Sequence, residues 1–149
     1  MDQPFVVLEQ QQDYRFHVSF SETLPILQVD EAPPVGSGQG PTPGHLLVAA
    51  VVNCMTDALL FAMRKFRMSP EPMRSQGRMD LGRNAEGRLR VQAIHVDIRL
   101  GIPSAGLEHL PRVLDQFEAF CTVGQSVAQG LPVLVTVRDS LGLVLKSPA

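Results

Sequence analysis

Hydrophobic and polar residues alternate at the start of the chain in a way that predicts three short β-strands. Residues 14–20, YRFHVSF, alternate strictly between apolar or aromatic side chains on one face and polar side chains on the other. Residues 4–9 form an apolar, β-branched run, and residues 25–29 form a weaker one. The segments EQQQD (9–13) and SETL (21–24) are typical of turns. The pattern predicts a three-stranded antiparallel meander.

A loop and a long apolar helix come next. Residues 30–42 are too rich in proline and glycine for regular structure. Thr42 is a good N-cap and Pro43 a good first helical residue, and we expect the helix to run to about Phe66. Almost all of its side chains are apolar, so it needs cover on every side, more than one chain of this length offers. The pattern therefore predicts a long buried central helix in a homodimer.

Two longer strands are expected after this helix. Residues 73–82 and 88–101 flank the turn 83–87, in which Gly87 is free to adopt a positive φ angle. The second strand switches its apolar face midway along its length. Such a switch predicts a β-bulge, or burial of part of the strand on both faces.

Helical periodicity returns in residues 103–121. Because proline is unfavourable inside a helix, we expect the helix proper to begin near Leu110, with Pro111 in its first turn. A further short helix is predicted for residues 122–130, and the last two strands for residues 131–137 and 141–146. The order βββ–α–ββ–α–ββ predicts an α+β fold with antiparallel sheets, in a single domain over residues 1–149.

Composition narrows the classes of function. The chain of 149 residues has 13 basic and 15 acidic side chains, a formal net charge of −2, which does not indicate nucleic-acid binding. It opens without a secretory pattern and has two cysteines, so we expect a cytoplasmic protein with free thiols or a transient redox pair. Residues 46–63 approach the length of a membrane span, but Asn53, Thr56 and Asp57 interrupt them. A helix buried in protein is therefore favoured over one in lipid.

Other site patterns are weak. Eight of the 13 basic residues lie between Arg64 and Arg90, where Phe66 is the only aromatic residue. Base stacking is therefore unsupported, and a solvated strand face is favoured. The four histidines and two cysteines lack metal-ligand spacing, and no glycine-rich loop suits a phosphate. We expect neither a metal nor an organic cofactor.

The two cysteines are the candidates for chemistry. Cys54 and Cys121 both lie in apolar runs, and a free cysteine is usually a small buried hydrophobe, so packing is the first interpretation. Asn53 raises a second one. As a good N-cap it would break the helix and place Cys54 at a new helix N-terminus, where thiol pKa values fall. Asp57, one turn further on, opposes this effect with its charge, and complementing the helix dipole is its simpler role.

Three segments form a fairly specific combination: GPTPGHLLVAAVVNCM (40–55), RNAEGRLR (83–90) and FEAFCTVGQSVAQGLPVLVTV (117–137). The combination resembles the OsmC/Ohr family over roughly residues 35–138. Members of that family are intertwined α+β homodimers, and the characterised ones reduce organic hydroperoxides with a reactive and a resolving cysteine. The resemblance implies that Cys54 is the peroxidatic thiol and that Cys121 is the resolving thiol.

The chain departs from these peroxidases at the groups that hold the reactive thiolate. In the peroxidases a glutamate follows the second proline of the helix start and acts with an arginine, whereas here Gly44 and then His45 follow. Residues 30–42 contain no Arg or Lys, and Arg15 is the only arginine before Cys54. In a straight helix His45 would lie on the face opposite Cys54, about 13 Å away along the axis. We therefore expect slow peroxide consumption.

Two functions stay open at this stage. The first is a thiol-dependent peroxidase of the oxidative stress response, peroxiredoxin-like in activity, in which Cys54 reduces small organic hydroperoxides, Cys121 resolves the product and an external thiol restores both. The second is a non-catalytic binding module that holds a small hydrophobic ligand at the dimer interface, which Gly44 favours. Neither nucleic acid nor a membrane is expected as a partner. The candidate binding residues are His45, Asn53, Asp57 and Gln125.

Overall fold

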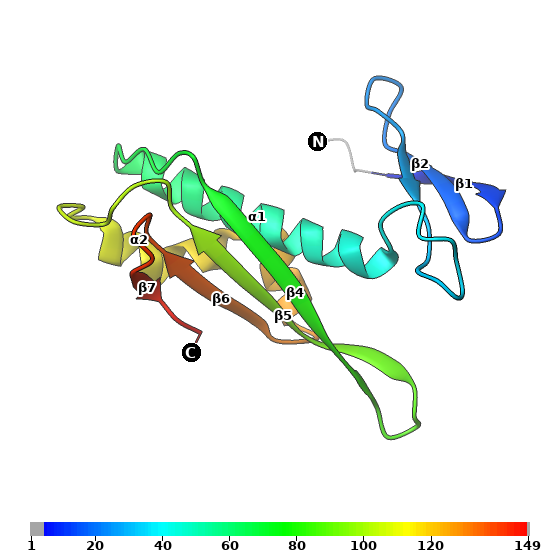
Figure 1. Ribbon diagram of the computed structural model, residues 1–149. Coiled ribbons are helices and arrows are strands. Elements are labelled where there is room, and N and C mark those ends of the chain that lie inside the picture. Colours follow the sequence, from blue (N-terminus) through cyan, green and yellow to red (C-terminus); the bar gives the residue numbers. More distant parts are fainter. Residues whose placement is uncertain (1–4, 149) are drawn as a thin grey trace. The chain divides into compact units, whose positions relative to one another are not determined.

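The structure, a computed structural model, describes residues 5–148, which form two compact units that divide between Leu47 and Val48 (Figure 1). The first unit contains β1 (Val7–Gln12), β2 (Arg15–Ser19), β3 (Leu27–Val29) and the start of α1 (Pro43–Lys65). The second contains the rest of α1, followed by β4 (Arg74–Arg83), β5 (Leu89–Arg99), α2 (Leu110–Gln116), the 3₁₀ helix η1 (Phe117–Phe120), α3 (Thr122–Ala128), β6 (Val133–Arg138) and β7 (Val144–Lys146). The expected order of elements is confirmed. A single domain over residues 1–149 stays a prediction.

The first three strands form the predicted antiparallel meander, in the order β1-β2-β3. The expected turn at residues 9–13 is wrong in its extent, because Gln10 pairs with Phe16 and the strand continues to Gln12. The turn is confined to the residues around Asp13, whose φ angle is 55°. Aspartate is one of the few residues that adopt this conformation readily, so the polar run extends the strand and its last member closes it.

The loop 30–42 is organised around the buried carboxylate of Asp30. Its oxygens accept backbone hydrogen bonds from Glu31 (2.8 Å), Ser37 (3.2 Å) and Gln39 (3.1 Å). The bond from Gln39, supported by the other two, lowers the pKa of Asp30 below its ordinary value. A segment without regular structure is thus held in place by one side chain.

The predicted start of α1 is confirmed and includes one unexpected partner. The Oγ1 atom of Thr42 accepts a hydrogen bond from the backbone N–H of His45 (3.2 Å), and the ring Nδ1 of His45 accepts one from the N–H of Thr42 (3.0 Å). This reciprocal arrangement is a capping box in which histidine takes the place usually held by Glu or Gln. His45 therefore has a structural role at the helix start.

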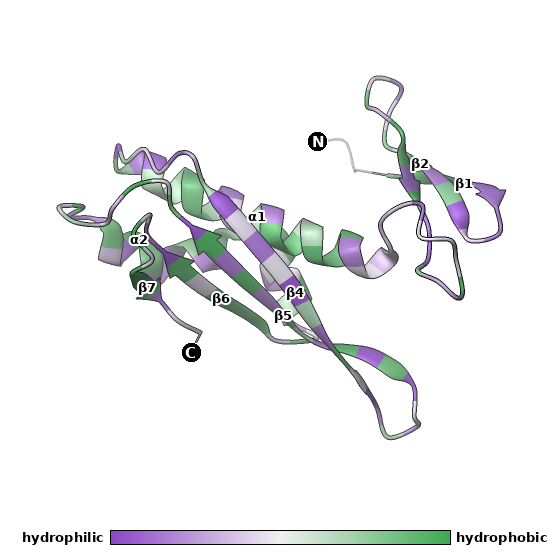
Figure 2. Cartoon of the chain, viewed as in Figure 1, coloured by the Kyte–Doolittle hydropathy of each residue, from purple (hydrophilic) through white to green (hydrophobic). Residues whose placement is uncertain are grey.

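The second unit is built on a four-stranded sheet in the order β4-β5-β6-β7. The expectation of antiparallel sheets holds for its outer pairs, but β5 and β6 are parallel. The reason is their connection, since α2, η1 and α3 form a crossover long enough to return the chain to the same end of the sheet. The helices lie on one face of this sheet (Figure 1), and the colouring of Figure 2 shows that α1 and β6 contain many hydrophobic residues.

The predicted β-bulge and hairpin turn are both present. Asp80 pairs with Ala93 and Leu81 with Val91, which leaves Gln92 as the extra residue of β5. In the turn, Gly87 has a φ angle of 77°. The bulge explains the switch of the apolar face that the sequence of β5 displays.

Helix α1 is covered on one side only. Its buried side chains form a stripe with a spacing of four residues: Val51, Met55, Leu59 and Met63. Only 22% of its most apolar 18-residue stretch is buried, and Phe61 is 65% exposed. Its own sheet covers a single face, as expected of one chain, and burial of the remaining faces by a second copy stays a prediction. By length and composition α1 could cross a membrane, a test that the core helices of soluble proteins also pass.

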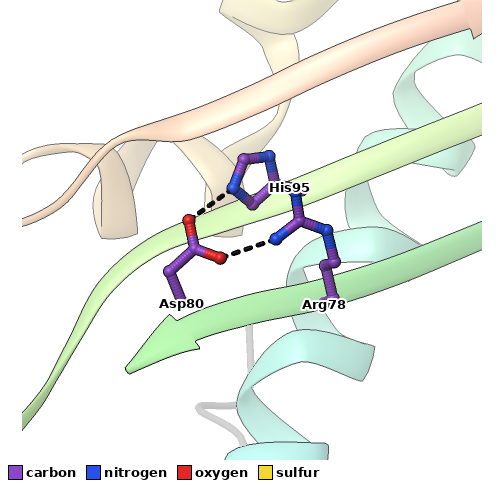
Figure 3. A network of polar contacts seen from close by, with 3 residues as sticks. All are labelled: Arg78, Asp80 and His95. Atoms are coloured by element: carbon purple, nitrogen blue, oxygen red, sulfur yellow. Dashed lines mark hydrogen bonds and ion pairs between the residues drawn. The ribbon is translucent and has the colours of Figure 1, made fainter. Parts of the chain in front are cut away.

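The other face of the four-stranded sheet is polar. Gly77 contacts α1, since a Cβ atom there would lie 2.3 Å from Val52, so the neighbouring residues of β4 point to the opposite side. On that side Asp80 accepts hydrogen bonds from Arg78 (2.6 Å) and His95 (2.7 Å), as Figure 3 shows. The bond with His95 lowers the pKa of Asp80. This network organises the face remote from the cysteines.

Candidate functional site

Cys54 lies in the middle of α1, which is continuous from Pro43 to Lys65. The predicted break at Asn53 is therefore wrong. The side chain of Asn53 donates a hydrogen bond to the carboxylate of Asp57 (3.1 Å) on the exposed side of the helix, so it is engaged one turn ahead and caps no backbone group. Cys54 is therefore not located at a helix N-terminus. It is half-buried, at the edge of the buried stripe.

Cys121 occupies the N-cap of α3 and is completely buried. Its Sγ atom accepts a hydrogen bond from the backbone N–H of Gly124 (3.3 Å). A Cβ atom on Gly124 would lie 2.8 Å from this sulfur and 2.8 Å from the end of Met55. A residue without a side chain therefore lets the first turn of α3 lie directly against the sulfur.

The structure places the Cys54 thiol close enough to Cys121 to affect the pKa of Cys121. Both cysteines are free. Burial, followed by the bond with Cys54, raises the pKa of the Cys121 thiol from 9.0 to about 11. Cys121 therefore keeps its proton at neutral pH, and its S–H is the donor when Cys54 is a thiolate.

The position of Cys121 is fixed by Glu118. The carbonyl of Glu118 accepts hydrogen bonds from the N–H of Cys121 (3.1 Å) and from the side chain of Gln125 (2.9 Å). Its carboxylate lies 2.6 Å from the Nζ atom of Lys146, which also donates to the carbonyl of Leu114. Gln125, a candidate binding residue, thus braces the loop that carries Cys121, and β7 is linked to the same loop through Lys146.

An apolar cavity of about 320 Å³ lies between α1 and the α2–η1 segment. Ala58, one turn after Cys54, lines it, and so does Phe120, the residue before Cys121. The remaining lining residues are Phe61, Ala62, Lys65, Phe66, Arg112, Val113, Gln116 and Phe117. The cavity is therefore adjacent in sequence to both cysteines, and its size is within the range of small-molecule sites.

Of the six residues chosen from the sequence, only the two cysteines come together as a site. Asn53 and Asp57 bond to each other, His45 caps a helix and Gln125 braces a loop. Within residues 5–148 no group of three or more His, Cys, Asp and Glu side chains could hold a metal ion.

The sequence analysis did not identify Lys65 as a residue on the same side of α1 as Cys54, although its spacing from Cys54 along the helix indicated this. Lys65 follows Cys54 by 11 residues, which at 100° per residue returns it to nearly the same face of the helix. No sequence pattern indicated Arg112 or Phe120, because they belong to the α2–η1 segment, whose packing on α1 is visible only in the fold.

Comparison with solved structures supports the fold. The chain resembles an OsmC-like protein from Vibrio cholerae with a TM-score of 0.77 and 16% identity, over 92% of this chain and 99% of that one. An OsmC-like protein from Mycoplasma pneumoniae gives 0.76 and 13%, over 93% and 97%. The organic hydroperoxide resistance protein OhrB of Bacillus subtilis gives 0.68 and 13%, over 92% and 98%. At these identities the likeness establishes the fold alone.

A search of the curated proteins finds no match to the chain. The model of one protein family, described as OsmC-like protein, matches residues 36–136. This match spans both cysteines and well over half of the sequence. The chain therefore belongs to the OsmC-like protein family.

Proposed function

We propose that the protein is a thiol-dependent peroxidase that reduces organic hydroperoxides, with Cys54 as the peroxidatic thiol and Cys121 as the resolving thiol. The observation that carries the proposal is the pair of neighbouring thiols. Cys54 is half-buried and lies one helical turn before Ala58, which lines an apolar cavity, whereas Cys121 is completely buried. Family membership supports the assignment, since relatives such as the Bacillus subtilis protein are described as organic hydroperoxide resistance proteins.

The reaction begins at the more accessible sulfur. The Cys54 thiolate attacks the terminal oxygen of the hydroperoxide and the O–O bond breaks, which gives a sulfenic acid on Cys54 and an alkoxide that takes up a proton to become the alcohol. The Cys121 sulfur then attacks the sulfenic sulfur. Its proton leaves with the hydroxyl group as water, and a disulfide joins the two residues. An external dithiol supplies the two electrons and two protons that restore both thiols.

The roles of the two cysteines follow from their surroundings. Cys121 keeps its proton and has no exposed surface, so it is a poor first nucleophile. It ends a 3₁₀ helix and begins a short α-helix, whereas Cys54 is fixed within a long one. Any backbone movement needed for the disulfide therefore comes from the segment around Cys121.

The proposal includes a homodimer in the cytoplasm. The exposed face of α1, which includes Phe61, is the surface that a second copy would cover. A reducing compartment suits two free cysteines that form a transient bond.

The test is to locate the oxidation products. The reduced protein is treated with a stoichiometric amount of cumene hydroperoxide and analysed by peptide mapping, with and without the sulfenic-acid reagent dimedone. We expect a disulfide between Cys54 and Cys121 in the wild type and a dimedone adduct on Cys54 in Cys121→Ser. Cys54→Ser is the matched control and should consume no hydroperoxide. Oxidation of Cys54 with Cys121 still free in the wild type would remove Cys121 from the mechanism.

A second candidate function is a binding module without turnover. It is favoured by the cavity of about 320 Å³ together with Gly44 at the position where the family's peroxidases have a glutamate. The same experiment separates the two functions, because a binding module would give no dimedone adduct and no alcohol product.

A further inference from the structure

The face of the four-stranded sheet that is turned away from the helices carries three arginines in register. Arg74 of β4 pairs with Arg99 of β5, and Arg99 pairs with Arg138 of β6. The neighbouring residue of each strand is directed to the helical side, by a hydrogen bond to α1 or by burial: Ser75, Ile98 and Val137. Because successive residues of a strand point to opposite faces, the three arginines lie side by side on the open face, on strands about 4.8 Å apart. We call them the arginine row.

The arginine row is unfavourable for the fold, because like charges directly opposite each other in a sheet destabilise it. Within residues 5–148, only Arg138 has an acidic partner, since its Nε atom donates to Asp97 at 3.1 Å. Arg99 donates to a backbone carbonyl of the turn between β6 and β7 (2.8 Å). The carboxylate of Asp139 in that turn already accepts four other hydrogen bonds. A sheet that keeps such a local cost commonly has a functional site there, and an anion between the guanidinium groups would remove the cost.

A polar cavity of about 320 Å³ adjoins the arginine row on this face. Two residues further along the three strands, Gln76, Asp97 and Thr136 form the next row of paired positions, and all three line the cavity. Arg78 and His95 line its far end, where the network of Figure 3 holds them in place. The cavity floor is therefore a lattice of polar side chains with the arginine row along one border.

The polar groups of this cavity keep hydrogen-bonding capacity that the fold does not use. Within residues 5–148, the hydrogen bonds of the lining side chains are those of Arg78, His95 and Asp97, and each leaves further atoms of these groups available. The amide of Gln76 and the hydroxyl of Thr136 are available as a whole. Such a mixture of donors and acceptors suits hydroxyl groups, each of which donates one hydrogen bond and accepts others. No Phe, Tyr or Trp lines the cavity, so a stacked nucleobase is not favoured.

We propose that this face binds a sugar phosphate, with the phosphate on the arginine row and the sugar hydroxyl groups over Gln76, Asp97 and Thr136. Guanidinium groups bind phosphate oxygens through paired hydrogen bonds and stay charged at every physiological pH. The two rows are about 6.7 Å apart along the strands, comparable to the distance from the phosphate to the ring hydroxyls of a hexose phosphate. Between these rows and the network of Figure 3 there are four arginines and two aspartates, although the whole chain has a net charge of −2. Positive charge is thus concentrated where the phosphate would lie.

Binding is tested by calorimetric titration of the full-length protein with glucose 6-phosphate, and with glucose and inorganic phosphate as its two halves. We expect wild type to bind glucose 6-phosphate about tenfold more tightly than either half. Arg99→Gln should weaken the binding of glucose 6-phosphate and of phosphate about tenfold, because both lose a charge-assisted hydrogen bond. Arg88→Gln, which removes an exposed arginine of the hairpin turn, is the matched control and should bind as wild type does.

The sugar part of the site has a test of its own in Thr136→Val, which removes one hydroxyl group and keeps a β-branched side chain suited to a strand. It should weaken the binding of glucose 6-phosphate about fivefold and leave the binding of inorganic phosphate unchanged. Equal binding of glucose 6-phosphate and inorganic phosphate by wild type, or an equal loss of both ligands in Thr136→Val, would overturn the proposal.

Two further measurements separate this site from a general basic surface and from the thiol chemistry. A DNA duplex that bound more tightly than glucose 6-phosphate, with the same loss in Arg88→Gln as in Arg99→Gln, would assign the arginines to a nucleic-acid surface and overturn the proposal. Cys54→Ser should bind glucose 6-phosphate as wild type does, because the arginine row lies on the sheet face opposite α1. A failure of the proposed peroxidase function would therefore leave this inference unaffected.

Discussion

The N-terminal three-stranded sheet and the C-terminal four-stranded sheet differ in how far they cover their own apolar side chains. Every residue of β1 is exposed, and the large hydrophobic residues of this part that stay exposed are Phe5, Val6, Val7, Leu8, Tyr14, Phe20, Leu24 and Ile26. In the second unit, by contrast, Ile94, Val96 and Ile98 of β5 are almost completely buried. One sheet has a helical layer of its own and the other has only the start of a helix.

This difference indicates that the C-terminal sheet can be stable within one chain, whereas the N-terminal sheet needs further contacts. A small sheet without a second layer is marginal in water, because its apolar face has nothing to pack on. The apolar residues at its surface also line a cavity of about 460 Å³, formed in part by Phe5, Phe20 and Ile26. We propose that a second copy of the chain supplies the cover, which would make the N-terminal sheet the part most dependent on assembly.

The largest expected effect comes from a charge placed in the uncovered N-terminal surface. Wild type should sediment at twice the chain mass of 16.3 kDa. Ile26→Asp should weaken dimerisation at least tenfold, because a charge would be buried at the contact in place of an apolar side chain worth about 1.5–3 kcal/mol. Sedimentation velocity over a range of concentrations measures the change.

The control for this variant is Leu141→Asp, which places the same charge at a side chain that is even more exposed, in the turn before β7. It should leave the sedimentation profile unchanged. A wild type that stays monomeric at micromolar concentration would contradict the proposal, and the exposed N-terminal residues would then need a different partner.

The second effect concerns the packing of the covered sheet. A Cβ atom on Gly77 would lie 2.3 Å from a methyl group of Val52 and 2.8 Å from one of Val48. Gly77→Ala should therefore lower the free energy of unfolding by about 1–3 kcal/mol, the usual cost of overpacking. Urea denaturation monitored by circular dichroism gives the value.

Gly130→Ala is the matched control for this substitution. Its added Cβ atom would meet one backbone oxygen at 3.8 Å, an ordinary contact, so its stability should differ from wild type by less than about 0.5 kcal/mol. Equal stability of the two variants would mean that α1 moves away from β4 at little cost.

The third effect is on the loop that carries Cys121. Glu118 and Lys146 are both about three-quarters buried and their charges lie 2.6 Å apart. Glu118→Gln should release the loop and increase the rate at which Cys121 reacts with an aromatic disulfide reagent several-fold, with a loss of stability of about 1–2 kcal/mol. Glu86→Gln, which changes an exposed ion pair in the hairpin turn, should leave both quantities unchanged. An unchanged Cys121 rate in Glu118→Gln would show that backbone bonds alone hold the loop.

Local signals in the sequence predicted most of the fold. The N-cap at Thr42, the position of Pro111 in the first turn of α2 and the turn at Gly87 all follow from the preferences of single residues, and all three are confirmed. The parallel pairing of β5 with β6 could not be predicted in this way. It depends on how far a crossover of three helices carries the chain, which no single residue specifies.

The candidate site likewise contains residues that the sequence could predict and residues that only the fold reveals. Both cysteines were visible in the sequence, but Asn53 was misinterpreted, because an asparagine can cap a helix or bond to a side chain one turn ahead, and the choice depends on the face it occupies. Lys65 of α1 and Arg112 of α2 line the same cavity. Such a pair is created by packing, so residue patterns along either helix cannot reveal it.

The smallest expected effect appears in acid and compares one buried carboxylate in each unit. Asp30 is held by backbone bonds from Gln39 and its neighbours. Burial raises the pKa of Asp139, but hydrogen bonds from Ser104, Leu143 and Leu141 lower it by more. The pKa values of both groups therefore lie below the ordinary value of 3.8. The unfolded chain then binds more protons than the folded chain near and below pH 3.8, and the stabilisation by these groups is complete above that pH and lost as the pH falls through the folded-state values.

Amide hydrogen exchange measured from pH 6 to pH 2.5 tests this comparison loop by loop. Relative to the intrinsic exchange rate at each pH, the protection of residues 31–39 should fall more steeply in acid than the protection of residues 140–143, because the Asp30 loop belongs to the unit with the smaller core. Asp30→Asn and Asp139→Asn should each be less stable than wild type at pH 7 and approach it at low pH, since an amide cannot accept all of the carboxylate's bonds and does not titrate. If both loops loosened together at one pH, the carboxylates would be reporting global unfolding, and the two units would be equally dependent on their own contacts.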